Sequence, residues 1–487
     1  MAVCCGKITS PSLPTPKQDS VRIETWSATL DNTEELVKTP TRNRQFRLAH
    51  QNLCITHIDF EQRLLVGFTQ LIVQPTASNL RKLYLNCRQC RVHRVLLECV
   101  DTKPPTYEGS SKLTGPKNSR VPSPADLPVV HTDPSVEICE RDSKFRTLDS
   151  FQRRHSFVLS QTDPDEEVGE LTIRIPPDFW PLVSNERPIR ITLEFSLSKP
   201  KSGFYFIVPQ TEGTLADRGV HAFTAGIPNT SRYWFPCVDC SEPCTWKIEV
   251  TVPEDMIAVA PGELVDAPYY TGDLVHKTYH FYLAQPVAAP YIGLAIGAFE
   301  VYPDPTLSNN AAHFCPTGLL PLLKHTISHV PEMIEYYEAI LASQYPFATI
   351  KTVFVDRAFS DFQAYASLLI FPVDLLHSPQ IIDQAIETRK IISLAIASQF
   401  FGCFIAMHTW SDAWLPTGIA GYLSGLYQKR VFGNNEYRRI ISNEMRQVTT
   451  YEHTKYGILL NPSRCVTKST HFGLTSPQVS SVFSHCK

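Results

Sequence analysis

The spacing of apolar residues changes once along this chain, and that change constrains the fold more than any other sequence feature. Between Phe46 and Pro303 the apolar residues fall in short runs that end at proline and other turn residues, and in one run Leu83, Leu85 and Cys87 occupy every second position. Alternation of this kind is typical of a strand with one buried face. Many such runs in succession predict an antiparallel β domain of the saddle or sandwich type.

Beyond Pro303 the apolar spacing lengthens to three and four residues, which predicts helices. Residues 319–344 carry a helical stripe that Pro331 is expected to kink or restart, and residues 385–407 are apolar on most faces, as in a buried helix. Gly433 is predicted to stop the helix that follows. With one short strand at 350–356, the fold class is multidomain α+β, in which the N-terminal β domain precedes a mostly α-helical domain.

Composition divides the chain into five segments. Residues 1–43 are polar and interrupted by prolines, and residues 101–134 are rich in Pro, Ser, Lys and Thr, so we expect a disordered arm and a disordered insertion. The insertion interrupts a β domain that spans 44–303, and a helical domain is expected at 304–462. Residues 463–487 lose helical periodicity and are expected to form an irregular tail.

Charge and cysteine usage narrow the class of protein. The net charge of −3 gives no strong field toward nucleic acid or membrane, and neither a signal peptide nor a long apolar stretch is evident, so a soluble intracellular protein is expected. In such a protein the 14 cysteines are expected to be reduced. Cys87-x-x-Cys90 and Cys237-x-x-Cys240 each have the spacing of half a zinc site, but buried structural thiols are the alternative.

Three separated stretches resemble one enzyme family. Three stretches, RYWFPCVDCSEPCTWKIEVTV at 232–252, QYPFATIKTVFVD at 344–356 and SQFFGCF with WSDAWLPTGIAGY at 398–422, are similar, in order and spacing, to segments of zinc aminopeptidases of the aminopeptidase N type. The resemblance implies that the second domain is a thermolysin-like, metallopeptidase-type domain.

The resemblance also implies where a zinc site belongs. In that family two histidines one helical turn apart and a later glutamate bind zinc, and a glutamate between the histidines acts as general base. Counted from Gln399, the histidine positions hold Leu394 and Ser398, the base position holds Ala395, and the third ligand position holds Thr417. None of these side chains offers the imidazole, thiolate or carboxylate that zinc favours.

A second family position agrees with this interpretation. A glutamate that grips the free amino end of a peptide in the family aligns with Ala366. The resemblance therefore implies a pseudo-aminopeptidase without metal, cofactor or small-molecule substrate. Two alternatives stay open: an active zinc aminopeptidase with displaced ligands, for which His325 and His329 have the spacing, and a peptide-binding pseudo-enzyme that uses the old cleft.

Among degenerate members of the family, the chain is similar to a TBP-associated factor of the general transcription factor TFIID. The stretches that carry this likeness are 320–341, 351–371 and 398–438. It implies a noncatalytic scaffold in the nucleus that acts in assembly of the RNA polymerase II preinitiation complex and binds core-promoter (initiator) DNA. Other TBP-associated subunits would be its partners, and no membrane contact is expected. Members of that group are longer, so we expect a fragment or an isoform.

Basic residues offer limited support for DNA contact. Arg88, Arg91 and Arg94 lie in the acid-free stretch 80–95, where they could neutralise phosphates, although a solvated strand face is the alternative. No recognition helix or zinc finger is evident, so backbone contact is the role expected. A second acid-free run contains Lys38, Arg42, Arg44 and Arg47.

Overall fold

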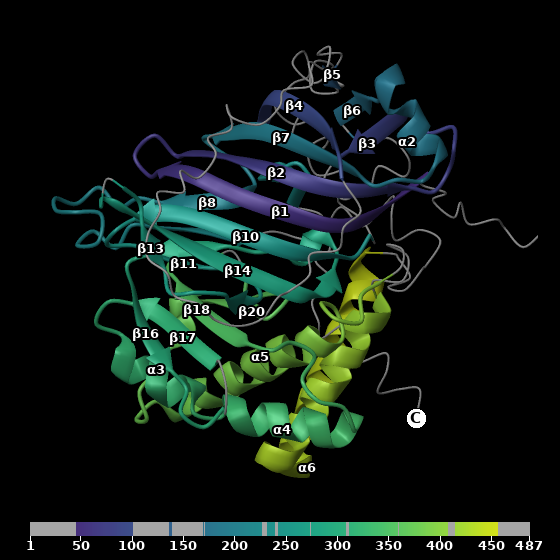
Figure 1. The fold of residues 1–487 in the computed structure, drawn as a ribbon. Helices are drawn as coiled ribbons and strands as arrows, with labels where there is room; N and C mark the ends of the chain where they lie inside the picture. The colour runs from purple at the N-terminus through teal and green to yellow at the C-terminus, as the bar shows by residue number, and fades with distance from the viewer. Residues whose placement is uncertain are drawn as a thin grey trace, which may run out of the picture. The chain divides into compact units, whose positions relative to one another are not determined.

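The structure is a computed structural model, and it describes most of the chain between residues 45 and 455 (Figure 1). The described ranges are 45–100, 136–138, 169, 171–225, 231–238, 242–272, 274–307, 311–358, 360–407 and 414–455. The arm expected at 1–43, the insertion expected at 101–134 and the tail expected at 463–487 lie outside the described residues.

The largest sheet has eight strands, in the order β12-β14-β10-β1-β2-β7-β4 with β13 beside β14. Its strands are β1 (Phe46–Asp59), β2 (Leu64–Pro75), β4 (Arg91–Cys99), β7 (Ile189–Ser198), β10 (Cys244–Pro253), β12 (Glu263–Leu264), β13 (Tyr269–Tyr270) and β14 (His276–Val287). Neighbours pair antiparallel except for β1 and β10, which run parallel. The expectation of a purely antiparallel domain was wrong at this pair, because strands far apart in sequence can return in either direction, whereas a short hairpin cannot.

One face of this sheet is apolar and the other polar. On β1, Leu53 and Ile55 are fully buried, whereas Asn52 on the opposite face donates a hydrogen bond of 3.2 Å to Gln70 on β2. This alternation is the pattern expected from the sequence. It also holds on β3, where Leu83 and its period-2 neighbours lie in the apolar core.

Two smaller sheets complete the β-rich part of the chain. They follow the orders β3-β6-β5 and β11-β15-β9-β8. The strands are β3 (Lys82–Leu85), β5 (Val136–Ile138), β6 (Leu171–Arg174), β8 (Gly203–Ile207), β9 (His221–Ala225), β11 (Ile257–Val259) and β15 (Ala295–Gly297), and a short helix, α2 (Trp180–Ser184), precedes β7.

The later part of the chain combines helices with a mixed five-stranded sheet, in the order β16-β17-β18-β20-β19. The elements are β16 (Phe299–Pro303), β17 (Ala311–Pro316), α3 (Leu320–Ile327), α4 (Val330–Leu341), β18 (Ile350–Val355), β19 (Gln363–Tyr365), β20 (Leu368–Pro372), α5 (Ile382–Phe400) and α6 (Trp414–Lys455). A mostly α-helical domain was therefore too simple an expectation. Two of these strands were predicted from the sequence: β16 falls in the β-type runs that end at Pro303, and β18 matches the strand expected at 350–356. The strands β17, β19 and β20 were not predicted, because they are short and show no clear period-2 alternation.

Helix boundaries follow the predicted breakers. Helix α3 ends at Ile327, and α4 begins at Val330 with Pro331 in its first turn, where a missing N–H costs nothing. Gly433 has φ 85° and interrupts α6 at the predicted position. No helix among the described residues is long and apolar enough to span a membrane.

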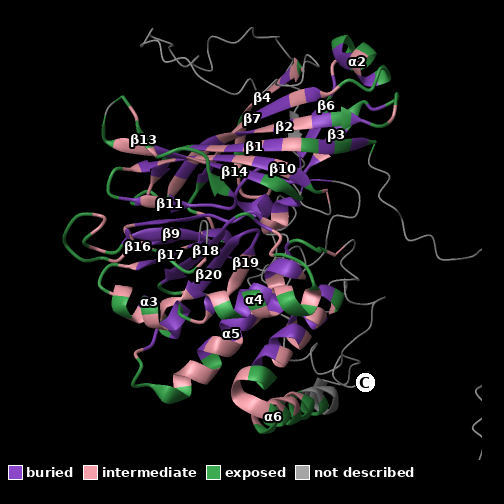
Figure 2. Ribbon diagram, turned by 60° about the horizontal axis from the view of Figure 1, so that its bottom comes forward, coloured by how far each residue is buried: buried purple, intermediate pink, exposed green. Residues whose placement is uncertain are grey.

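Packing is continuous between the β-rich part and the later part. The core of the large sheet includes Phe347, Ala366 and Cys403, which come from the segments around the five-stranded sheet. Figure 2 shows the strands mostly buried, whereas the later turns of α6 alternate between exposed and intermediate residues. The helix that carries the zinc positions expected from the sequence, α5, lies in the second core together with α4 and the first half of α6.

Candidate functional site

Helices α5 and α6 carry the four positions at which the resemblance places a zinc site. Leu394, Ala395 and Ser398 lie on α5, and Thr417 lies in the first turn of α6. Ala395 is fully buried in the apolar core, and Leu394 packs against the same core. The Ser398 hydroxyl donates a hydrogen bond of 2.9 Å to the Leu394 carbonyl one turn earlier.

These residues do not fit a zinc ion. The only polar side-chain atom that α5 presents at these three positions is the Ser398 hydroxyl, and it is turned back to its own helix. Zinc needs imidazole, thiolate or carboxylate donors, which Leu394 and Ala395 lack. Within the described residues, no group of three or more His, Cys, Asp or Glu side chains could hold a metal ion.

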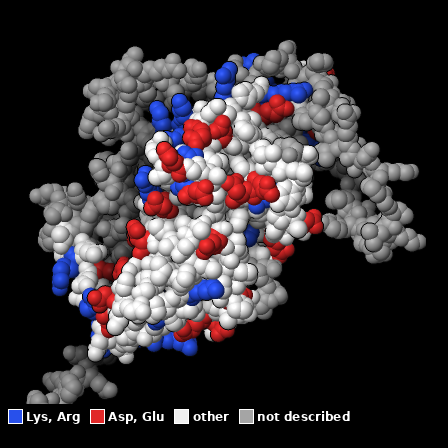
Figure 3. All heavy atoms as spheres, turned by 90° about the vertical axis from the view of Figure 1, so that its left-hand side faces the viewer, with Lys and Arg blue, Asp and Glu red and all other residues white. Residues whose placement is uncertain are grey.

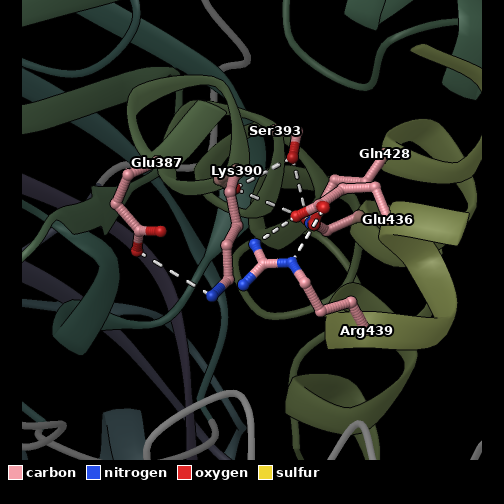
Figure 4. Close-up of polar contacts among 7 residues, drawn as sticks. Glu387, Lys390, Ser393, Gln428, Glu436 and Arg439 are labelled. Carbon is pink, nitrogen blue, oxygen red and sulfur yellow. Dashed lines mark hydrogen bonds and ion pairs between the residues drawn. The ribbon is translucent and has the colours of Figure 1, made fainter. Parts of the chain in front are cut away.

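A row of hydrogen bonds joins α5 to α6. The hydroxyls of Ser393 on α5 and Ser424 on α6 lie 2.7 Å apart, and Gln428 Nε2 donates to Ser424 Oγ at 3.0 Å (Figure 4). Tyr337 on α4 donates to the Ser393 carbonyl at 2.9 Å. All four side chains are buried, so these bonds link three helices in a low-dielectric core. Helices that would share a metal in an active enzyme are held here by side-chain and backbone hydrogen bonds.

Ion pairs near this row are peripheral. Lys390 Nζ lies 3.8 Å from Glu387 Oε1, and Arg439 Nε donates to Glu436 Oε2 at 2.8 Å (Figure 4). Each pair joins residues three positions apart on one helix and is partly solvent-exposed. Such pairs contribute about 0.3–0.5 kcal/mol or less, and because each lies within one helix they do not join α5 to α6.

Gln399 connects α5 to the strand segment that bears Ala366. Its Nε2 donates to the Tyr365 carbonyl at 2.8 Å, and its Oε1 accepts from the Ser367 N–H at 2.9 Å. The side chain is fully buried and thereby pairs with the backbone on both sides of Ala366. Its presence in the stretch SQFFG has a structural reason that does not involve metal.

Gly402 follows the end of α5 and has φ 145°, which favours glycine. A Cβ atom at this position would lie 2.9 Å from the Ser398 carbonyl oxygen. The chain can therefore reverse closely around the helix end only with glycine here. Both Gln399 and Gly402 preserve the frame around the substituted positions.

Ala366 and Ser367 form the second family position. Ala366 is fully buried in the core of the large sheet, and its N–H donates to the Tyr291 carbonyl at 2.9 Å. Ser367 adopts φ 59°, and its hydroxyl accepts a hydrogen bond of 2.8 Å from the Gly262 N–H. The segment that would hold a substrate amine in the family serves here as a junction between α5 and the loop before β12.

Lys351 on β18 fastens the same loop. Its Nζ donates to the Ala260 carbonyl at 2.7 Å and also to the Gly262 carbonyl, and it lies 4.4 Å from the centre of the Phe281 ring. Burial lowers the pKa of this amine to about 7, although Glu263 opposes the shift. Sequence reasoning missed this site, because a lysine inside a predicted strand ordinarily points to solvent.

The structure separates His325 and His329, which have metal-ligand spacing. His325 lies near the end of α3 and His329 precedes α4, so the two are not on one continuous helix. His329 is hydrogen-bonded to Arg389, whereas the His325 ring packs 5.1 Å from that of His377. Burial lowers the pKa of both histidines, and the Arg389 charge adds to the effect. A cation beside the pair disfavours a metal ion.

Three of the four motif cysteines come together. Asn86, next to Cys87, and Cys237 form an isolated β-bridge with N–O distances of 2.8 and 3.0 Å, and Cys87 Sγ donates to the Cys90 carbonyl at 3.6 Å. Burial raises the pKa of the Cys90 thiol, and the neighbouring Cys87 and Cys237 raise it further. A raised pKa keeps the Cys90 thiol protonated and unreactive, which favours a structural role. Cys240 lies outside the described residues.

The structure places two of the three candidate DNA-contacting arginines on the edge strand β4 and the third in the loop before it. Arg91 is exposed on the edge strand β4, and Arg94 on the same strand lies 3.8 Å from Glu194. Arg88 precedes the strand, where its guanidinium is 5.9 Å from the centre of the Tyr233 ring. Of the second basic run, only Arg47 falls within the described residues, and it is exposed on β1.

Known proteins are similar to this chain over most of its length. Residues 325–469 match the Peptidase family M1 domain. The chain is 42% identical over 420 residues to Transcription initiation factor TFIID subunit 2 of Gallus gallus, covering 86% of this chain and 34% of that protein. It is also 42% identical over 424 residues to Transcription initiation factor TFIID subunit 2 of Drosophila melanogaster, covering 86% of this chain and 33% of that protein. Aminopeptidase M1 of Arabidopsis thaliana is 24% identical over 244 residues, covering 48% of this chain and 27% of that protein.

These similarities confirm the resemblance seen in the sequence, to TFIID subunit 2 and more distantly to zinc aminopeptidases. The chain spans about one third of the length of the TFIID subunit 2 proteins that it matches.

Proposed function

We propose that this chain, similar as it is to TFIID subunit 2, acts as a noncatalytic scaffold subunit of the general transcription factor TFIID. The observation that carries the proposal is 42% identity over 86% of the chain, which includes both the β-rich part and the later part. As such a subunit it takes part in assembly of the RNA polymerase II preinitiation complex in the nucleus. Its partners are other TBP-associated subunits and core-promoter DNA at the initiator.

The absence of catalysis rests on the chemistry of the substituted positions. A hydrolytic zinc ion needs three protein ligands and a positioned base. Leu394, Ala395, Ser398 and Thr417 supply none of these, and Ala366 leaves no carboxylate for a substrate amine. The retained residues Gln399 and Gly402 have structural roles, which supports a fold kept as a frame. In this proposal the frame comprises a β domain at 44–303 and a catalytically dead thermolysin-like domain at 304–462.

Co-purification tests the proposal. The tagged chain is expressed in cells and purified from nuclear extract under mild conditions. It is expected to co-purify with TBP-associated subunits. The same preparation is expected to carry no stoichiometric zinc and to leave aminoacyl-amide substrates intact. Recovery without any TFIID component contradicts the scaffold role. One equivalent of zinc together with hydrolysis would instead support the aminopeptidase alternative, and enrichment of one peptide segment alone would support the peptide-binding alternative.

Contact with DNA is assigned to the β4 edge, with Arg91 and Arg94 touching phosphates and Arg88 supporting the turn before them. The double charge reversal Arg91→Glu/Arg94→Glu is expected to weaken promoter-DNA binding roughly tenfold and to lower the salt slope by about 0.9 for each phosphate that is no longer neutralised. Arg438→Glu/Arg446→Glu, which reverses two exposed charges on α6, is the matched control. Unchanged affinity and salt slope in the double variant would remove this edge from the DNA interface.

A further inference from the structure

Exposed apolar side chains concentrate in one short part of the β-rich region. Of the 16 large hydrophobic residues that are exposed in the described part of the chain, seven lie between Leu264 and Tyr282. Single exposed apolar residues are ordinary on protein surfaces, whereas a cluster marks a place where another molecule binds. This segment contains β12, β13 and the start of β14, at the edge of the large sheet.

Three of these residues form a contiguous surface around His280 on the polar face of β14. The Val265 N–H donates to the His280 carbonyl at 2.9 Å, and the Tyr269 ring packs edge-on at 5.2 Å from the His280 ring. Tyr282 lies two residues further along β14 and therefore on the same face. Val265, Tyr269 and Tyr282 are 52%, 50% and 43% exposed, and we call them the tyrosine patch.

The patch is held in place before any partner arrives. Tyr269 pairs with Thr278 across the β13–β14 ladder, and its hydroxyl lies 3.3 Å from His280 Nε2. Tyr282 pairs with Glu263 on β12. A tyrosine on a paired strand offers large amphipathic area at a small entropic cost, which is why tyrosine is enriched at binding hot spots.

Charge around the patch selects the partner. Glu263 and Asp266 are exposed beside it, and Lys247, which lies opposite Tyr282 on β10, is paired with Glu249 at 2.7 Å. Figure 3, which views the side where β13 lies in Figure 1, shows more acidic than basic side chains across the described surface. An acidic rim repels nucleic acid, and it also disfavours pairing of two copies of the same surface.

We propose that the tyrosine patch binds an arginine- or lysine-rich segment of a partner protein that also carries apolar side chains. Guanidinium groups stack on tyrosine faces and pair with carboxylates, and aliphatic side chains cover the remaining apolar area. The inference is independent of the TFIID assignment, because it concerns the chemistry of one face of this chain.

Peptide titration tests the proposal on the whole chain. The probe is a fluorescein-labelled nonapeptide of alternating arginine and valine, compared with a glutamate–valine and an arginine–serine peptide of equal length. Fluorescence anisotropy is expected to show salt-sensitive binding of the arginine–valine peptide and at least tenfold weaker binding of the other two. If the arginine–serine peptide binds as tightly as the arginine–valine peptide, apolar contact with the patch is not needed and that part of the proposal is wrong. If the glutamate–valine peptide binds as tightly, the carboxylates beside the patch do not select a basic partner.

Variants locate the binding. Tyr269→Ser/Tyr282→Ser is expected to lose roughly tenfold in affinity or more. Glu263→Lys/Asp266→Lys is expected to weaken binding and remove most of its salt dependence. Ile381→Ser/Ile382→Ser, which removes two exposed apolar side chains elsewhere, is the control and should bind as the wild type does. If the Tyr269→Ser/Tyr282→Ser variant has an unchanged unfolding midpoint and binds the arginine–valine peptide with wild-type affinity, the tyrosine patch is not the binding site. Co-purification with TFIID does not depend on this result, so the two proposals fail separately.

Discussion

Replacing Gln399 with leucine is expected to lower the free energy of unfolding by about 2–4 kcal/mol, because it leaves the buried Ser367 N–H unpaired, at about 1–3 kcal/mol, and removes a second hydrogen bond worth about 1 kcal/mol. The second bond is the one to the Tyr365 carbonyl, which keeps its pairing with Leu368 across the turn. Leucine has a similar volume, so most of the loss would come from polar groups rather than from a cavity. Denaturant titration measures the total effect.

Hydrogen exchange separates this cause from general loosening. The Ser367 amide is expected to lose protection before amides in the middle of β18, because its acceptor is the side chain that is removed. Gln428→Leu is the matched control: it is also buried on a helix, but its Nε2 donates to the Ser424 hydroxyl rather than to backbone, and its Oε1 has no partner. A smaller loss of about 1 kcal/mol is expected there. Equal losses in the two variants would mean that Gln399 acts only by filling space.

Local structure could be predicted from the sequence where one residue decides it. Pro331 restarts a helix because it lacks an N–H, and Gly433 interrupts one because it adopts a positive φ. Period-2 alternation likewise placed Leu83 and Leu85 in the core. Each of these effects acts within a few residues, so the local sequence is enough to predict it.

Features that depend on distant partners could not be predicted in this way. The parallel pairing of β1 with β10 joins segments about 200 residues apart, and no local pattern fixes its direction. The Ser393–Ser424 contact joins two helices through hydroxyls that are ordinary in either helix alone. The alternation in KTYHFYLAQP indicates that Tyr282 and the neighbouring Phe281 point to opposite faces of the sheet. Only the structure shows that Val265 and Tyr269 lie beside Tyr282 on the outer face.

Lys351 is the residue for which pH is expected to matter most. Burial lowers its pKa from the ordinary 10.5 to about 7 in the folded protein. Below pH 7 both the folded and the unfolded chain carry the proton, so the cost of burying the charge is present in full. Between pH 7 and 10.5 the unfolded chain holds a proton that the folded chain lacks, and the unfolding free energy therefore rises with pH by about 1.4 kcal/mol per unit from this group.

The neutral amine still has two N–H groups, which are enough for the Ala260 and Gly262 carbonyls, so deprotonation removes the burial cost without breaking the link to the loop. In Lys351→Met this pH dependence should disappear. The unfolding free energy of the wild type minus that of the variant is then expected to increase by roughly 2–3 kcal/mol from pH 7 to 9.

Thr349→Val provides the matched comparison, because Thr349 donates to the same Gly262 carbonyl at 3.1 Å and has no titrating group. Its loss of about 1 kcal/mol is expected to be the same at every pH. If the wild-type and Lys351→Met curves stay parallel from pH 7 to 9, the ammonium remains charged in the core. The Phe281 ring and the two carbonyls would then stabilise the cation enough to offset its burial, and the loop before β12 would be fixed by a permanent charge rather than by a neutral amine.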